Sequence, residues 1–339
     1  MLSRAPMSPL FRPLLSLAVA AFAAPVAAAA PAADAEGGIY AELAALEARV
    51  AAIGFRLTTA NVGWCPVRQA QFGWIWGDPR LYDGKHRGAA LAAYGAGTSD
   101  LPFLAAVAPE SPAGRAGLHV GDAIAAVGGA GAVAPEGDDP FARIAAFETA
   151  AAALPAAAPA TLARGGGHRV AIMPVAGCVS DFRVEARDRA SGAADGRLVL
   201  ISAGLARFAA DGDELAAAVA HELAHNILRH RERLDAADVD RGLFKDFGRS
   251  ARLFRQTEVE ADRLSVWLMR GAGYDPQAAV RFWRRFGTRG GPVLIQPGTH
   301  PRWRDRVRSI EEEIAAIRAA DAAGRPLDPP LIAAPPPLE

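Results

Sequence analysis

The sequence has little that would direct it to nucleic acid, to a membrane or to a disulfide scaffold. Its 37 Lys and Arg are balanced by 37 Asp and Glu, which excludes a basic nucleic-acid-binding surface and a polybasic membrane patch. Two cysteines in 339 residues are too few to replace a hydrophobic core. After the N-terminal segment, no apolar run is long enough to span a bilayer. Because 51% of the residues are hydrophobic, we expect about two packed domains.

Residues 1–33 have the pattern of a secretory signal peptide. Arg4 and Arg12 precede a short apolar run, residues 13–22, and small residues follow Pro25. The run is short for a membrane span and is followed by proline, so we expect it to be removed after export. The protein would then be periplasmic, with no stable membrane span. A tether formed by an uncleaved segment is the alternative.

Residues 37–66 predict a helix followed by a strand. Apolar residues recur at helical spacing over residues 39–53. Gly54 is expected to end this helix, and residues 55–62 to form the strand. We assign this segment to the same domain as the C-terminal half of the chain.

Residues 71–175 predict a small β-rich domain. The sequence SPAGRAGL at 111–118 predicts a short helical turn opened by Ser-Pro, and a Gly-Asp turn then leads into a strand. An apolar strand precedes this segment, and a helix and a strand follow it. The pattern resembles a PDZ domain of the bacterial type, which binds an extended peptide, such as a C-terminal tail, beside its own sheet. A spacer that binds no peptide is the alternative.

Residues 178–320 are mostly helical after a short β-rich start, and the proline-rich residues 322–339 are expected to be disordered. If the N-terminal segment packs with the helical part, the β-rich unit is an insertion. Cys65 and Cys178 would then flank it, and an even pair in an exported protein suggests a disulfide. Two separate buried thiols are the alternative.

The sequence DELAAAVAHELAHNILRH, residues 213–230, is apolar almost all the way round, which predicts a buried helix. His221 and His225 are four residues apart and share one face, so both imidazoles can bind one cation. Glu222 lies about 100° further round, where it can reach a water molecule rather than join the ligands. His230 is expected to interact with the C-terminal end of the helix and not to bind metal.

A second predicted helix supplies carboxylates in the sequence QTEVEADR. Glu258 and Asp262 are four residues apart and share one face. One can bind the metal while the other accepts a hydrogen bond from a ligand imidazole. Glu260 is expected to face solvent or a basic neighbour. Two imidazoles, one carboxylate and an open fourth position are typical of catalytic zinc, so we predict one Zn²⁺ per chain.

The combination of HELAH with EVEAD resembles the M48 family of zinc metallopeptidases. The resemblance implies an α+β fold: a mostly helical, gluzincin-type peptidase domain with a small edge-exposed sheet, carrying the inserted PDZ-like domain. It implies that Glu258 is the third ligand, that Asp262 orients an imidazole, and that Glu222 is the general base. The expected activity is endopeptidase cleavage of exported, unfolded polypeptides, held as extended strands along an edge near residues 197–202. The PDZ-like domain would either recruit substrates or regulate the cleavage.

The sequence Thr299-His300-Pro301 resembles a further element of that family, in which a histidine lies near the metal. His300 would stabilise an oxyanion or close the open metal position, whereas a helix-capping loop is the plainer alternative because Pro301 suits a first helical turn. The alternative function is a peptide-binding, chaperone-like protein whose zinc site is latent or vestigial.

Overall fold

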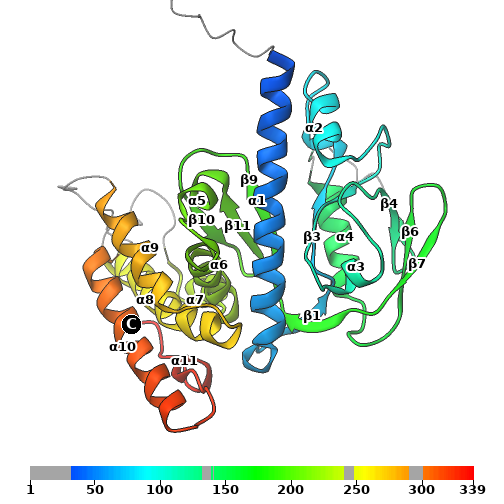
Figure 1. Cartoon of the computed structure of the whole chain (residues 1–339). Coiled ribbons are helices and arrows are strands. Elements are labelled where there is room, and N and C mark those ends of the chain that lie inside the picture. Colours follow the sequence, from blue (N-terminus) through cyan, green and yellow to red (C-terminus); the bar gives the residue numbers. More distant parts are fainter. Residues whose placement is uncertain (1–31, 132–138, 140, 240–247, 290–300) are drawn as a thin grey trace, which may run out of the picture.

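The computed structural model describes residues 32–131, 139, 141–239, 248–289 and 301–339. Within them the chain is α+β, with long helices and small sheets, as predicted. The first 31 residues, which hold most of the predicted signal peptide, and His300 lie outside the described residues. Helix α1 (Ala32–Ala60) stands between a β-rich unit and a mostly helical one (Figure 1).

Helix α1 passes through Gly54, so the prediction that this glycine ends the helix and that residues 55–62 form a strand is wrong. A Cβ at Gly54 would lie 2.6 Å from a ring atom of Phe182. The glycine therefore allows a strand of the helical unit to pack closely against the helix. A short 3₁₀ turn, η1 (Val62–Trp64), follows.

The β-rich unit leaves and rejoins the rest of the chain through two paired strands, β1 (Arg68–Gln71) and β8 (Val175–Cys178). They are antiparallel, with Arg68 opposite Cys178 and Gln71 opposite Val175. A disulfide joins Cys65 to Cys178 beside them, in agreement with the sequence prediction. The two stems of the unit are thus held together by a ladder and a covalent bond.

Between these stems lie a four-stranded antiparallel sheet, β5-β4-β6-β7, and a separate pair, β2-β3. The strands are β2 (Trp74–Gly77), β3 (Phe103–Val107), β4 (Ile124–Val127), β5 (Ala130–Gly131), β6 (Ala160–Arg164) and β7 (Arg169–Ile172). The helices are η2 (Pro79–Leu81), α2 (Arg87–Tyr94), α3 (Pro112–Arg115) and α4 (Ala142–Ala152). The unit has a core of its own around Trp76, Ile124 and Phe147, and its PDZ-like character stays a prediction.

The helical unit is built on a three-stranded sheet of order β10-β11-β9: β9 (Asp181–Glu185), β10 (Gly192–Ala194) and β11 (Leu198–Ser202). Strand β11 pairs in parallel with β9 and antiparallel with β10. The predicted edge strand near residues 197–202 is therefore central, and β10 is an edge. Sequence pattern could not distinguish the two because strand order depends on non-local pairing.

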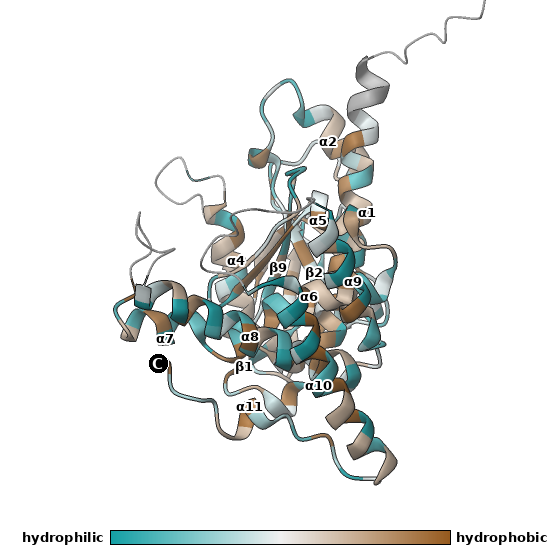
Figure 2. Cartoon of the chain, turned by 90° about the vertical axis from the view of Figure 1, so that its left-hand side faces the viewer, coloured by the Kyte–Doolittle hydropathy of each residue, from teal (hydrophilic) through white to brown (hydrophobic). Residues whose placement is uncertain are grey.

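Helices cover this sheet and each other. They are α5 (Ala203–Phe208), α6 (Gly212–Ile227), α7 (His230–Ala236), α8 (Gly248–Gly271), α9 (Gln277–Thr288) and α10 (Trp303–Ala322). Helix α6 packs against both the sheet and α8, and α9 and α10 complete the layer. Figure 2 shows both hydrophilic and hydrophobic residues along α8, α9 and α10, as expected of amphipathic helices that pack around a buried one.

The two units touch directly as well as through α1. The carboxylate of Glu148 on α4 lies 2.6 Å from the guanidinium of Arg183 on β9. Arg197, just before β11, donates to the Glu148 carbonyl oxygen and pairs with Asp181 at 2.7 Å. These charged groups hold the β-rich unit against the sheet of the helical unit.

The proline-rich C-terminal segment, predicted to be disordered, is ordered. It forms a short helix, α11 (Pro330–Ala333), in which Leu331 is buried. Beyond it the carbonyl oxygens of Pro336 and Pro337 accept hydrogen bonds from Arg233 and Gln256. Proline cannot donate from its own backbone, but its carbonyl remains a strong acceptor, and side chains of α7 and α8 use it here.

Across the described residues, no helix combines the length and the apolar character that crossing a membrane would require.

The contact between α1 and α2 leads to a pH-dependent prediction. Burial raises the pKa of Glu47 to about 7, and the hydrogen bond from the Tyr94 hydroxyl only partly lowers it. The contribution of Glu47 to the free energy of unfolding is fully present below the ordinary glutamate pKa of 4.5 and is lost as pH rises through about 7. We expect Glu47→Gln to raise the free energy of unfolding at pH 8 by about 1–3 kcal/mol, because one pKa unit corresponds to about 1.4 kcal/mol.

Denaturant unfolding at pH 8 and near pH 5 checks this expectation. The gain should shrink at the lower pH, where the carboxyl group is largely protonated in the folded protein. Tyr94→Phe is the matched variant, and it should lower the free energy of unfolding at pH 8. It removes the hydroxyl that donates to Glu47 at 2.7 Å. A Glu47→Gln protein less stable than the parent at pH 8 would contradict the assignment.

Candidate active site

Helix α6 carries the first part of the site. Asp211 caps it by accepting from the backbone N–H of Glu214, and most residues of the helix are buried. The helix ends at Ile227, and Arg229 adopts a left-handed conformation with φ of 54°. This reversal starts α7 at His230 and brings that side chain back towards His225. His230 therefore lies beyond the end of α6, contrary to its predicted place there.

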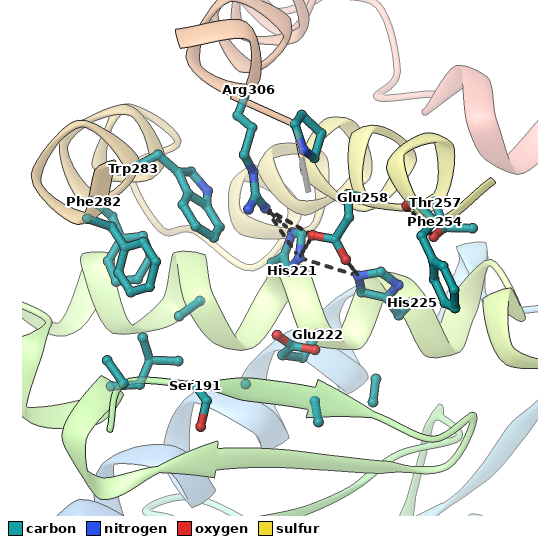
Figure 3. Close-up of a pocket in the computed structure, with 18 of the residues that line it drawn as sticks. Ser191, His221, Glu222, His225, Phe254, Thr257, Glu258, Phe282, Trp283 and Arg306 are labelled. Carbon is teal, nitrogen blue, oxygen red and sulfur yellow. Dashed lines mark hydrogen bonds and ion pairs between the residues drawn. The ribbon is translucent and has the colours of Figure 1, made fainter. Parts of the chain in front are cut away.

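The structure brings His221, His225 and Glu258 together from α6 and α8 (Figure 3). The two Nε2 atoms lie 3.3 Å apart, and each is 3.5 Å from a carboxylate oxygen of Glu258. Ligand atoms about 2.0–2.2 Å from a tetrahedral zinc ion lie about 3.3–3.6 Å from one another. The three side chains therefore have both the chemistry and the spacing that zinc requires.

Asp262 and Arg306 support His221 from behind. The Nδ1 atom of His221 lies 3.0 Å from Asp262 Oδ1, which leaves Nε2 for the cation. Both oxygens of Asp262 accept hydrogen bonds of 2.7 Å from Arg306, and both side chains are buried. Burial raises the pKa of Asp262, but Arg306 and His221 outweigh it and hold that pKa below its usual range.

The protonation of the ligands follows from the same contacts. Burial raises the pKa of Glu258, but its hydrogen bond with His221 and the electrostatic attraction of the surrounding histidines and Arg306 hold it well below its usual range. Burial and His230 lower the pKa of His225. Burial also acts to lower the pKa of His221, yet Asp262 and Glu258 raise it to about 10. Glu258 is thus ionised and His225 neutral, as metal ligands must be, and a bound cation would displace the proton of His221.

Glu222 projects from the other side of α6, towards the sheet, whereas His221 and His225 face α8, which carries Glu258 (Figure 3). Burial raises its pKa to about 7, and attraction to His221 only partly offsets that effect. A carboxylate of this pKa suits proton transfer near neutral pH. Strand β10 passes so close that a Cβ at Gly192 would overlap Glu222 Oε1.

This close approach makes Gly192 a sensitive position. We expect Gly192→Val to lower peptide cleavage by at least about tenfold, because its side chain would displace the Glu222 carboxylate from its place between α6 and the sheet. Melting temperature and zinc content should stay close to those of the parent, since the glycine lies on an edge strand away from the ligands. The matched control is Ala194→Val on the same strand, and equal activity in the Gly192 variant would contradict the geometry.

The site lies at the bottom of a large cleft with a volume of about 1370 Å³. Strand β10 forms one wall, and aromatic side chains of α8, α9 and α10 form much of the rest: Phe254, Phe282, Trp283, Phe286 and Trp303. The indole N–H of Trp283 is buried without a hydrogen-bond partner among the described residues. Arg306 stacks on the Trp283 ring at 3.5 Å from its centroid.

Four residues of the site were missed or misjudged from sequence: Arg306, Trp283, His230 and Glu260. The spacing carried a signal for Arg306, which is three residues after Trp303 and four before Ile310, on the apolar face of its helix. Glu260 is buried, although it does have the basic neighbour that was expected. Buried charge at an apolar position needs a partner, and that partner comes from another helix.

Two histidines and a glutamate presented by two packed helices, with a second glutamate next to the first histidine, have the arrangement of a metallopeptidase site of the HExxH class. The profile of peptidase family M48 matches residues 242–314, which include Glu258 and Asp262; the HELAH motif precedes the matched segment. The match supports an M48-type metallopeptidase domain in this part of the chain.

Two curated relatives are mitochondrial metalloendopeptidases named OMA1. The protein of Schizosaccharomyces pombe is 32% identical over 138 residues, covering 34% of this chain and 41% of the relative. That of Arabidopsis thaliana is 28% identical over 152 residues, covering 38% of this chain and 31% of the relative. The chain thus spans less than half the length of these relatives.

Proposed function

We propose that this protein is a zinc-dependent endopeptidase. The observation that carries the proposal is the set of three distances, 3.3, 3.5 and 3.5 Å, between the donor atoms of His221, His225 and Glu258. A site of three protein ligands keeps a fourth position for water, which is the catalytic rather than the structural arrangement. Its position at the base of an open cleft supports the same interpretation.

His221, His225 and Glu258 would hold the zinc ion, which would supply Lewis-acid chemistry by lowering the pKa of water and polarising a carbonyl group. Glu222 accepts the proton of the attacking water and passes it to the leaving amine nitrogen. Arg306, whose guanidinium lies 3.6 Å from a Glu258 oxygen, helps to keep that carboxylate ionised for metal binding. Asp262 keeps the His221 ring oriented throughout.

The substrate we propose is an extended polypeptide with a large apolar side chain near the cleaved bond. Strand β10 has one edge unpaired among the described strands, so a peptide can pair with it beside Glu222. The aromatic wall formed by α9 offers apolar surface for a side chain, and the Trp283 N–H, unpartnered among the described residues, can donate to a peptide carbonyl. Folded proteins rarely present such segments, which favours unfolded substrates.

Metal analysis of the purified protein, combined with a cleavage assay on unfolded casein, tests the proposal. We expect about one zinc per chain and cleavage that stops with a chelator and returns with added zinc. Casein binding without cleavage would favour the chaperone-like alternative. Zinc without cleavage under any condition would indicate a site closed by a further ligand, for which His300 is the candidate.

The disulfide supports export, because disulfides persist in oxidising compartments such as the periplasm. Cell fractionation, with the N-terminus of the mature protein sequenced, tests this location and the removal of residues 1–33. Recovery of the reduced protein from the cytoplasm would contradict it.

For the β-rich unit we propose recruitment of substrate through C-terminal tails, as its PDZ-like pattern implies. The full-length Glu222→Gln protein should bind fluorescent peptides with a free C-terminal carboxylate and not the same peptides with an amidated end. Equal binding of both forms, or of neither, would leave the unit with a regulatory or structural role instead.

A further inference from the structure

We infer that His230 is a positioning residue that fixes the orientation and the tautomer of the ligand His225, acting together with Glu260. This inference rests on the proposed zinc site and adds to it a second buried chain of polar side chains. His221 is already held by Asp262 and Arg306, whereas the contacts of His225 run in another direction, into the junction of α7 and α8.

Two short contacts connect His225 to Glu260 through His230. The Nδ1 atom of His225 lies 2.8 Å from Nδ1 of His230, and Nε2 of His230 lies 3.1 Å from Oε2 of Glu260. His230 and Glu260 are each only 2% exposed. The chain thus runs from the ligand to a buried carboxylate with no solvent-exposed member.

The direction of each hydrogen bond follows from the role of His225. Its Nε2 faces the other two ligands and must keep its lone pair for the cation, so its Nδ1 carries the hydrogen. That N–H donates to Nδ1 of His230, which must therefore be unprotonated there. His230 then carries its own hydrogen on Nε2 and donates it to the Glu260 carboxylate.

Glu260 is in turn held on its far side. Arg233 of α7 donates to Oε2 at 2.6 Å, and Gln256 of α8 donates to Oε1 at 2.9 Å. The same two side chains bind the carbonyl oxygens of Pro336 and Pro337, so the C-terminal segment helps to fix them. Each ligand histidine is therefore held by hydrogen bonds that lead to a buried carboxylate, which in turn is bound by an arginine.

Zinc affinity of the full-length protein, measured by competition with a chromophoric chelator, tests the inference independently of cleavage. We expect His230→Leu to weaken zinc binding by about 10–100-fold, the usual cost of losing a partner of a ligand imidazole. In His230→Asn the loss should stay below about tenfold, because its side-chain oxygen can still accept from His225. The visible spectrum of the cobalt-substituted protein should change in the leucine variant.

Glu260→Gln provides a second route should the leucine variant not fold, because it keeps the side-chain volume but removes the charge; we expect about tenfold weaker binding. The matched control is Glu232→Gln on α7, whose carboxylate pairs with Arg229 at the surface and should leave affinity unchanged. Folded His230→Leu or Glu260→Gln protein with parental affinity and cobalt spectrum would overturn the inference. A parent protein that binds no zinc would overturn the proposed function as well.

Discussion

Replacing Glu222 by glutamine is expected to slow peptide cleavage by about 10²–10⁴-fold, the usual contribution of a positioned general base. Glutamine has nearly the same shape but cannot accept a proton from water at neutral pH. Because Glu222 faces the sheet, whereas the candidate ligands meet between α6 and α8, zinc should remain bound at the parental stoichiometry (Figure 3). Single-turnover cleavage of a casein-derived peptide, with zinc content measured on the same sample, checks both parts.

Glu258→Gln is the matched comparison, since it changes the same chemical group at a ligand position and should lose both zinc and activity. If Glu222→Gln instead lost its zinc, the residue would be a ligand and not the base. If it retained full activity, proton transfer would have to be assigned to another group in the cleft.

Replacing Arg306 by methionine is expected to lower the free energy of unfolding by about 3–5 kcal/mol, because it leaves a buried carboxylate without its partner. Asp262 is fully buried and receives two hydrogen bonds of 2.7 Å from this guanidinium. Without them the carboxylate becomes protonated or rotates, and its bond to His221 weakens. Denaturant unfolding of the metal-free protein measures the loss.

The double variant Arg306→Met with Asp262→Leu separates stability from metal binding. An apolar pair of similar volume can replace a buried ion pair with little loss of stability. We therefore expect the double variant to regain most of the lost stability but to bind zinc more weakly than the parent, because His221 has lost its carboxylate. Equal stability of the single variant and the parent would show that the pair is not buried in solution.

Periodicity explains what could be recognised from sequence. The residues of HELAH lie within one turn or so of a single helix, where local geometry alone places both imidazoles on one face. The same holds for Glu258 and Asp262 on α8. That the two helices would meet around one cation was implied by family resemblance, because no local pattern specifies which helices pack together. The structure brings the three side chains within reach of a single ion.

The predictions that failed depended on distant parts of the chain. Gly54 looks like a helix terminator, but the ring of Phe182 fills the space that a side chain would occupy and the helix continues. The tail looks disordered by composition, but Arg233 and Gln256 bind its carbonyl groups. In each case the deciding partner belongs to another element that is far away in sequence.

Residue type and short-range spacing are enough to predict the helices that carry the candidate ligands, the two imidazoles that share one face, and the neighbouring glutamate. The choice of Glu258 over Asp262 as the third ligand came from the family resemblance, and the sequence left two separate thiols as the alternative to a bond between Cys65 and Cys178. Long-range packing, in contrast, makes β10 the edge strand over Glu222 and sets Arg306 and His230 behind the two ligand imidazoles. These contacts depend on which buried polar groups come within hydrogen-bonding distance when separate helices and strands pack. A buried charge can be satisfied by any suitable partner that packing brings within reach, so its own neighbours in sequence do not reveal which partner that is.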